Sequence, residues 1–254
     1  MIATLHASIK AMSLALWIAV CCLFALPLKK LGKNAGRDRM VCLCYQGILR
    51  IIGIRLKVTG ALVAGRPLLL VTNHLSYLDI AIIGSGHAVR FTPKSEIATW
   101  PVIGGICRLC DAVFIDRRPD KVIEMKQATQ SALASGAVVC LFPESSTGSG
   151  VHLLPFRSSL FSLAEEPAGG CHLIVQPAAI AYRRIRRLPI DSVQWPRIAW
   201  YGDMNLVPHV WELLKLGPID AEMIFLPPLS FSQCRDRKEM AMQCRQAIAA
   251  AVEK

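Results

Sequence analysis

The sequence predicts an α/β domain with a central mixed, largely parallel sheet flanked by helices, preceded by an N-terminal membrane-associated helical segment. From about residue 58 onward, short apolar runs alternate with stretches of helical spacing, the pattern of α/β folds. Polar side chains gather where several of these runs end. Residues 11–28 carry no charge and are just long enough to cross a bilayer. We therefore assign the membrane-anchoring helices to residues 1–57 and the α/β domain to residues 58–254.

Basic residues flank the N-terminal apolar segment. Lys10 precedes it, and five basic residues follow it: Lys29, Lys30, Lys33, Arg37 and Arg39. The positive-inside tendency predicts a cytoplasmic downstream side, so we expect an uncleaved anchor in the inner or plasma membrane with the α/β domain in the cytoplasm. The anchor either spans the bilayer or is only partly inserted. Residues 40–58 read as an amphipathic helix that lies on the bilayer or packs on the domain.

The body reads as an alternation of strands and helices. Strands are expected at 68–71, 112–117, 137–145, 172–182 (interrupted by Pro177) and 221–229. Helices are expected at 76–83, 120–136, 158–166, 209–217 and 235–253.

The composition favours a membrane protein with an anionic partner. Hydrophobic residues make up 53% and charged residues 19%, a balance too apolar for a disordered chain. The net charge of +11 fits nucleic acid, an acidic lipid surface or an acidic protein, and charge alone does not choose among them. Residues 183–187, "RRIRR", either attract anionic lipid headgroups or an acidic carrier protein, or form a solvated basic edge.

Several catalytic classes lack sequence support. The ten cysteines are scattered, and only Cys107 and Cys110 form a CxxC pair, which without further ligands is weak support for zinc or redox chemistry. We expect reduced, mostly buried thiols and no metal site, and His152, His172 and His209 lack metal-ligand spacing. No P-loop, GxSxG or GxGxxG motif is present, so phosphoryl transfer, serine hydrolysis and dinucleotide redox chemistry have no motif behind them.

The stretch "VTNHLSYLDI", residues 71–80, places His74 and Asp79 five positions apart after an apolar run. In a helix these positions lie about 140° apart, so the two side chains meet only if His74 sits in a bend before the helix. A second interpretation is that Ser76 and Asp79 form a helix-starting capping box. Local spacing leaves both interpretations open.

Polar residues at three strand ends are expected to converge in one crevice. His74 and Asp79 follow one strand, Asp116 and Arg117 end the next, and Glu144 to Ser146 follow a third. A histidine base, an arginine and a carboxylate suit proton abstraction from an alcohol whose substrate carries an anionic group.

The order of motifs resembles a known family. "NHLSYLD", "FIDRR", "FPESS" and "VQPAAI", with "KSEIATWPVIGG" between them, resemble the membrane-bound glycerolipid acyltransferases, which include 1-acylglycerol-3-phosphate acyltransferases, over roughly residues 65–230. The resemblance implies acyl transfer from acyl-CoA or acyl-acyl carrier protein to the free hydroxyl of a lysolipid, foremost 1-acylglycerol-3-phosphate giving phosphatidic acid. His74 would be the general base and Asp79 its orienting partner. It implies no cofactor beyond the acyl co-substrate, no metal, and no nucleic-acid partner, with an anionic membrane surface nearby.

The same resemblance suggests the acceptor site. Arg117 would grip an anionic headgroup, and Glu144 would order the loop or accept a hydroxyl bond, although a structural Arg117–Glu144 ion pair is the alternative. The predicted substrate-binding set is completed by Ser145, Ser146, Asn73 and Lys94. Two residues depart from the family pattern, Ser145 and Asp111, each standing where glycine is usual.

The departures at Ser145 and Asp111 fit a different acceptor. The segment "YGDMNLVPHVW", residues 201–211, resembles bacterial relatives that acylate lyso-ornithine lipids. Thioester hydrolysis and a non-catalytic membrane-binding role are the competing functions.

Overall fold

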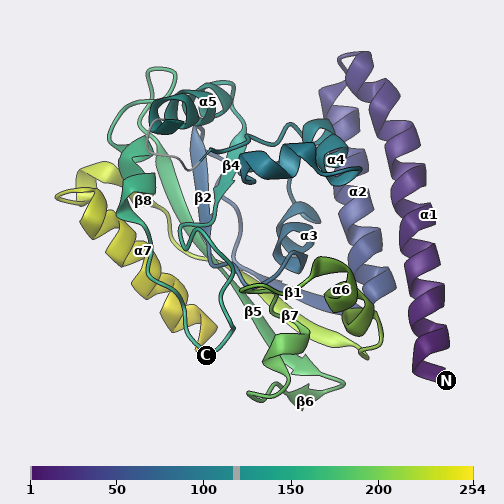
Figure 1. Ribbon diagram of the computed structural model, residues 1–254. Helices are drawn as coiled ribbons and strands as arrows, with labels where there is room; N and C mark the ends of the chain where they lie inside the picture. The colour runs from purple at the N-terminus through teal and green to yellow at the C-terminus, as the bar shows by residue number, and fades with distance from the viewer. Residues whose placement is uncertain (1, 117–120, 254) are drawn as a thin grey trace.

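The computed structural model describes residues 2–116 and 121–253, and within them one mixed sheet forms the centre of the molecule (Figure 1). Its main strands lie in the order β1 (Ile54–Thr59), β7 (Ile219–Phe225), β5 (Ile174–Ile185), β2 (Leu68–Thr72), β4 (Val138–Leu141) and β3 (Val89–Phe91). Short strands β6 (Leu188–Pro189) and β8 (Leu229–Ser230) pair with β5. Neighbouring main strands are parallel except β5 and β7, which confirms the predicted largely parallel sheet.

Strand β2 lies at the centre of the sheet and is buried on both faces. Leu68 and Leu70 belong to one hydrophobic core, with residues of helices α2 (Asn34–Ile52), α3 (Leu78–Gly84) and α6 (Leu206–Leu214). Leu69 and Val71 belong to the other, with residues of α5 (Val122–Ala134), a 3₁₀ helix (Ser158–Ala164) and α7 (Arg237–Val252). Burial on both faces explains why β2 reads as a continuous apolar run, because alternate side chains enter opposite cores.

The N-terminal helices form a hairpin at one side of the sheet. Helix α1 (Ile2–Lys30) packs along α2, and the Trp17 indole N–H donates to the Cys44 carbonyl at 3.0 Å. Gly47 makes room for this indole, because a Cβ there would collide with it. The outward face of α1 stays exposed, and α1 is long and apolar enough to cross a membrane by length and composition.

Two predicted elements were wrong. The helix expected over residues 40–58 ends at Ile52, because Gly53 takes a left-handed φ of 97° and Ile54 starts β1. The strand expected at 112–117 is only an isolated bridge between Ile115 and Lys94 in the part of the chain that is described.

Pro177 does not interrupt β5. It pairs with Val71 of β2 on one side, and on the other side it lies between the end of the β8 ladder at Val175 and the start of the β7 ladder at Ala178. A proline without an N–H is tolerated where no ladder needs its donor.

The described residues also form several short helical segments. They are α4 (Ile103–Leu109) and the 3₁₀ turns Ser95–Thr99, Trp195–Arg197 and Phe231–Gln233. Helix α4 packs near the hairpin, between it and the sheet (Figure 1).

Candidate functional site

His74 and Asp79 are in direct contact at the carboxyl end of β2. The chain leaves the sheet at Thr72, passes through a loop that holds His74, and enters α3 at Leu78. Nδ1 of His74 lies 2.8 Å from Oδ2 of Asp79. The bend that the five-residue spacing requires is therefore present, as predicted.

Asp79 is fully buried and is surrounded by hydrogen-bond donors. Besides His74, its Oδ2 accepts from the backbone N–H groups of Leu75 (2.7 Å) and Ser76 (2.9 Å). Asp79 thus satisfies backbone donors of the turn while it holds the imidazole. Only half of the capping box of Ser76 and Asp79 forms, because the Asp79 carboxylate accepts from the Ser76 N–H while the buried Ser76 hydroxyl has no hydrogen-bond partner in the described residues. These contacts fix the position of the Asp79 carboxylate beside the imidazole.

Tyr182 supplies a donor that the sequence analysis missed. Its phenol donates to Oδ1 of Asp79 at 2.7 Å from β5, 103 positions along the chain. Burial and the neighbouring carboxylate raise the pKa of Tyr182 well above its usual value, so the phenol stays protonated. Nothing local marks this tyrosine, which reads as an ordinary apolar strand residue.

Two contacts fix the imidazole of His74, one at Nδ1 and one on a ring face. It stacks on Phe142 with ring centroids 3.9 Å apart and an interplanar angle of 17°. With Nδ1 facing Asp79 and one ring face covered, Nε2 is the nitrogen left to meet a reacting group. The side chain keeps 18% of its surface exposed, in contrast to the fully enclosed Asp79.

Glu144 orders the loop after β4 through both of its oxygens. Oε1 accepts from the His74 backbone N–H at 2.7 Å, and Oε2 accepts from that of Leu154 at 2.9 Å. The Gly148 N–H in turn donates to the His74 carbonyl at 2.9 Å. Burial raises the pKa of Glu144 to about 7, although the hydrogen bonds from the two backbone N–H groups act in the opposite direction and lower it. Of the two roles expected for Glu144, these contacts match loop ordering.

The two departures from glycine keep a glycine-like backbone. Ser145 has a φ of 61° and Asp111 a φ of 52°, both in the left-handed region. The Asp111 carboxylate contacts Lys29 of α1 at 2.6 Å and also Arg37 of α2. Asp111 therefore joins the helical hairpin to the domain, and its contacts do not indicate a changed acceptor site.

The other predicted binding residues have mixed surroundings. Both polar atoms of Asn73 bond the backbone of Ile180, at 2.8 and 2.9 Å, so its contacts give it a structural role and do not support substrate binding. Ser146 and Lys94 are exposed, in the loops after β4 and β3. Arg117 lies outside the described residues.

The segment after β6 packs beside the His74 loop. The backbone N–H of Trp200 donates to the Leu75 carbonyl at 2.9 Å, and the Tyr77 phenol pairs with Nδ1 of His209 at 3.0 Å. His209 is buried, with Nε2 3.2 Å from the Pro196 carbonyl, so both of its ring nitrogens have a partner. Residues 195–209 thus form one wall next to the turn that carries His74.

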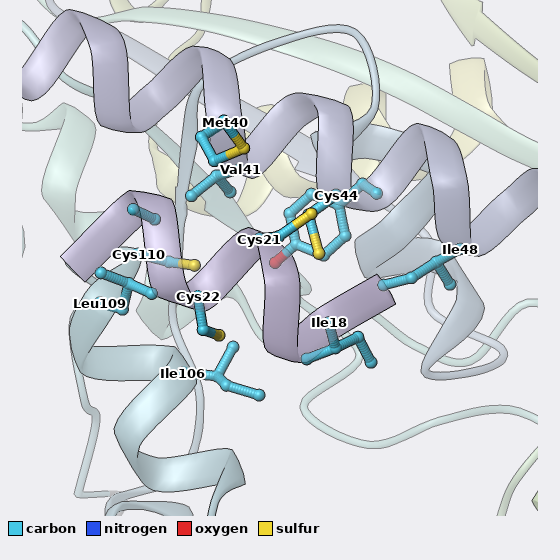
Figure 2. A pocket seen from close by; sticks show the side chains of 12 residues that line it. Ile18, Cys21, Cys22, Met40, Val41, Cys44, Ile48, Ile106, Leu109 and Cys110 are labelled. Atoms are coloured by element: carbon cyan, nitrogen blue, oxygen red, sulfur yellow. The ribbon is translucent and has the colours of Figure 1, made fainter. Parts of the chain in front are cut away.

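Four of the cysteines surround a pocket outside this site. Cys21 and Cys22 of α1, Cys44 of α2 and Cys110 after α4 surround a small, apolar pocket (Figure 2). Burial raises the pKa of Cys110 to about 11, so its thiol is neutral. All ten cysteines are free, and no group of three or more potential metal ligands occurs in the described ranges.

Comparisons with known proteins give consistent matches. A family model described as "Acyltransferase" matches residues 55–181. The chain is 35% identical to a lyso-ornithine lipid O-acyltransferase of Brucella abortus over 82% of this chain and 80% of that protein. It is 29% identical to a 1-acyl-sn-glycerol-3-phosphate acyltransferase of Neisseria meningitidis over 91% of each chain. A crystal structure of the 1-acyl-sn-glycerophosphate acyltransferase of Thermotoga maritima shares the fold, with a TM-score of 0.73, 14% identity, and coverage of 99% and 94% of the two chains.

Proposed function

Because this chain belongs to the glycerolipid acyltransferase family and is an acyltransferase, we propose that it transfers an acyl group from acyl-CoA or acyl-acyl carrier protein to the free hydroxyl of a lysolipid. His74 and Asp79 are the proposed general-base dyad. The observation that carries this assignment is the 2.8 Å contact between a partly exposed imidazole and a fully buried carboxylate.

The reaction needs one well-placed base. Nε2 of His74 takes the proton of the acceptor hydroxyl while the oxygen attacks the thioester carbonyl. The tetrahedral intermediate then collapses, the C–S bond breaks, and the imidazolium returns the proton to the leaving thiolate. The thioester is already activated, so no acyl-enzyme intermediate is required.

Asp79 favours this chemistry in two ways. Its Oδ2 accepts from Nδ1, which selects the tautomer with a basic Nε2, and its negative charge stabilises the imidazolium that forms. The donors from Leu75, Ser76 and Tyr182 hold the carboxylate in place, so the imidazole does not have to reorganise during the reaction.

Two acceptors are candidates. The resemblance of the motifs puts 1-acylglycerol-3-phosphate first, but the relatives named for lyso-ornithine lipid reach 35% identity against 29% for the bacterial 1-acylglycerol-3-phosphate enzyme. Residues 195–209, beside the His74 loop, also include part of the segment that resembles lyso-ornithine lipid enzymes. We therefore place lyso-ornithine lipid first and 1-acylglycerol-3-phosphate second.

The proposed location is a membrane surface, with the α/β domain in the cytoplasm. Helix α1 is tied to the domain near both ends, by Lys10 to the Leu216 carbonyl at 3.4 Å and by Lys29 to Asp111 at 2.6 Å. A helix held along the domain in this way fits partial insertion better than crossing, since crossing would carry one end away from its partners.

A labelled-donor assay tests the function. The purified full chain is incubated with radiolabelled acyl-acyl carrier protein or acyl-CoA, and with lyso-ornithine lipid and 1-acylglycerol-3-phosphate in separate reactions. We expect label in the lysolipid product with the wild type and loss of this product with His74→Ala. Label released only as free fatty acid would identify a thioesterase instead, and equal product with His74→Ala would reject the dyad.

A further inference from the structure

A groove that contains several basic side chains lies at the N-terminal end of α1. It has a volume of about 410 Å³ and lies between α1, the end of α6 and the β5–β6 turn. Its lining includes four basic side chains, which are His6, Lys10, Arg186 and Lys215. None of the lining residues is acidic. No residue that contacts His74 or Asp79 lines this groove, so it is separate from the site described above.

The basic side chains of the groove still have hydrogen-bond donors with which to bind an anion. Two of the three donors of the Lys10 ammonium go to the carbonyls of Ile52 (2.7 Å) and Leu216 (3.4 Å). Lys215 pairs with Glu212 at 2.6 Å, an exposed pair that contributes little. No carboxylate in the described ranges lies within ion-pair distance of the Arg186 guanidinium, although a guanidinium can hold a phosphate through two parallel hydrogen bonds.

The β5–β6 turn holds Arg186 in an unusual conformation. Arg186 and Arg187 form a two-residue turn with φ of 51° and 71°, where Asn-Gly is the favoured pair. The Arg186 side chain lies over Gly217, where a Cβ would approach its Cγ to 2.5 Å. A strained backbone and a matching glycine together direct this arginine along the groove.

The groove borders an exposed apolar surface. Ile2 lines the groove and is 74% exposed, and Leu5 and Ile9 continue the exposed face of α1. A ligand with a phosphate at one end and acyl chains at the other matches both surfaces. An acidic protein would leave these apolar side chains without an apolar partner.

We propose that the groove formed by Lys10, Arg186 and Lys215 binds the phosphate of an anionic phospholipid, whose acyl chains lie along the exposed face of α1. The bound lipid would hold the N-terminal end of the hairpin at the bilayer surface. This site goes beyond the acyl-transfer function and does not depend on it.

Lipid retention by the full chain tests the proposal. The protein in detergent micelles is titrated with phosphatidylglycerol or phosphatidylcholine, and bound lipid is counted by native mass spectrometry. Each surface charge near a headgroup changes affinity about fivefold. We expect a preference for phosphatidylglycerol, a loss of about fivefold with Arg186→Asn, and about 25-fold with Arg186→Asn combined with Lys215→Gln.

The matched control is Arg187→Asn, which removes the same charge from the same turn outside the groove. Asparagine tolerates left-handed φ, so both asparagine variants are expected to fold, as thermal melting will verify. Equal losses for Arg186→Asn and Arg187→Asn would overturn the proposal in favour of diffuse surface charge. Equal retention of both lipids, or equally tight binding of inorganic phosphate, would also overturn it. Turnover is not the readout, so any of these results leaves the acyl-transfer proposal standing.

Discussion

The phenol of Tyr182 and the imidazole of His74 are held by opposite oxygens of one carboxylate. Tyr182 donates to Oδ1 of Asp79 at 2.7 Å, and Nδ1 of His74 lies 2.8 Å from Oδ2. Strand β5 therefore contributes a hydrogen bond to the proposed dyad, whose two side chains follow β2 and lie in α3. We infer from this contact that Tyr182 is a positioning residue, which acts on His74 through Asp79.

Replacing Tyr182 by phenylalanine is expected to lower kcat by about 10- to 100-fold with little change in KM. The variant removes one hydrogen bond to a buried charged group, worth about 1.5–3 kcal/mol. Steady-state kinetics with saturating acyl donor will measure the two parameters separately. Tyr77→Phe is the matched control, because that phenol pairs with His209 and not with Asp79. Equal kcat losses in both variants would assign Tyr182 a general packing role.

Asp79→Asn is expected to lower kcat by about 10²-fold or more while the fold is kept. The amide retains the shape of the carboxylate, but it lacks the negative charge that stabilises the imidazolium. Its NH₂ group would also face the hydrogen-bond donors that now surround the carboxylate. His74→Ala is expected to cost 10²- to 10⁴-fold, the usual range for a general base. Wild-type turnover in either variant, with thermal melting that shows a folded protein, would exclude the dyad.

Glu144→Gln is expected to destabilise the protein by about 1–3 kcal/mol, because an amide accepts from only one side and leaves one of two buried backbone donors unpaired. The donors concerned are the N–H groups of His74 and Leu154. Denaturant or thermal unfolding in detergent will measure the difference. Unchanged stability would mean that the loop is held by other contacts.

The wild type is expected to lose stability as pH rises from about 4.5 to about 7 because of Glu144. Its folded pKa of about 7 lies above the ordinary value of 4.5, so the folded state binds the proton more tightly within this window. The slope from this one group is at most about 1.4 kcal/mol per pH unit. Melting curves across this range should show a smaller slope for Glu144→Gln, and an identical slope would contradict the assignment.

Asp111→Asn is expected to loosen the helical hairpin from the domain at a cost of roughly 1–3 kcal/mol, a value reduced from that of a buried pair because Asp111 is partly exposed. Asparagine tolerates the left-handed φ, so this variant tests the charge and not the backbone. The contacts at risk are those with Lys29 and the almost fully buried Arg37. Hydrogen exchange should rise in the first turns of α2, and no rise there would refute the link.

Local patterns were sufficient for the strand, bend and helix around His74 and Asp79. The apolar run of β2 is buried on both faces, and a spacing of five residues excludes a shared helix face, so the bend follows from the chain itself. The helix expected over 40–58 ends before Gly53, because Gly53 adopts a left-handed conformation and the next residues form β1, which pairs in parallel with β7. Hydrophobic content alone does not distinguish these outcomes.

The sequence by itself determined the α/β alternation and the bend that brings His74 to Asp79, because these features depend on neighbours within a few residues, and its ordered motifs over roughly residues 65–230 resemble acyltransferases. The tertiary structure decided that Tyr182 donates to Asp79, that Asn73 is tied to Ile180, and that Asp111 joins the hairpin. These contacts depend on strand register and on helix docking across long stretches of chain. Their partners come together only when the sheet closes, so no local pattern of residues records them.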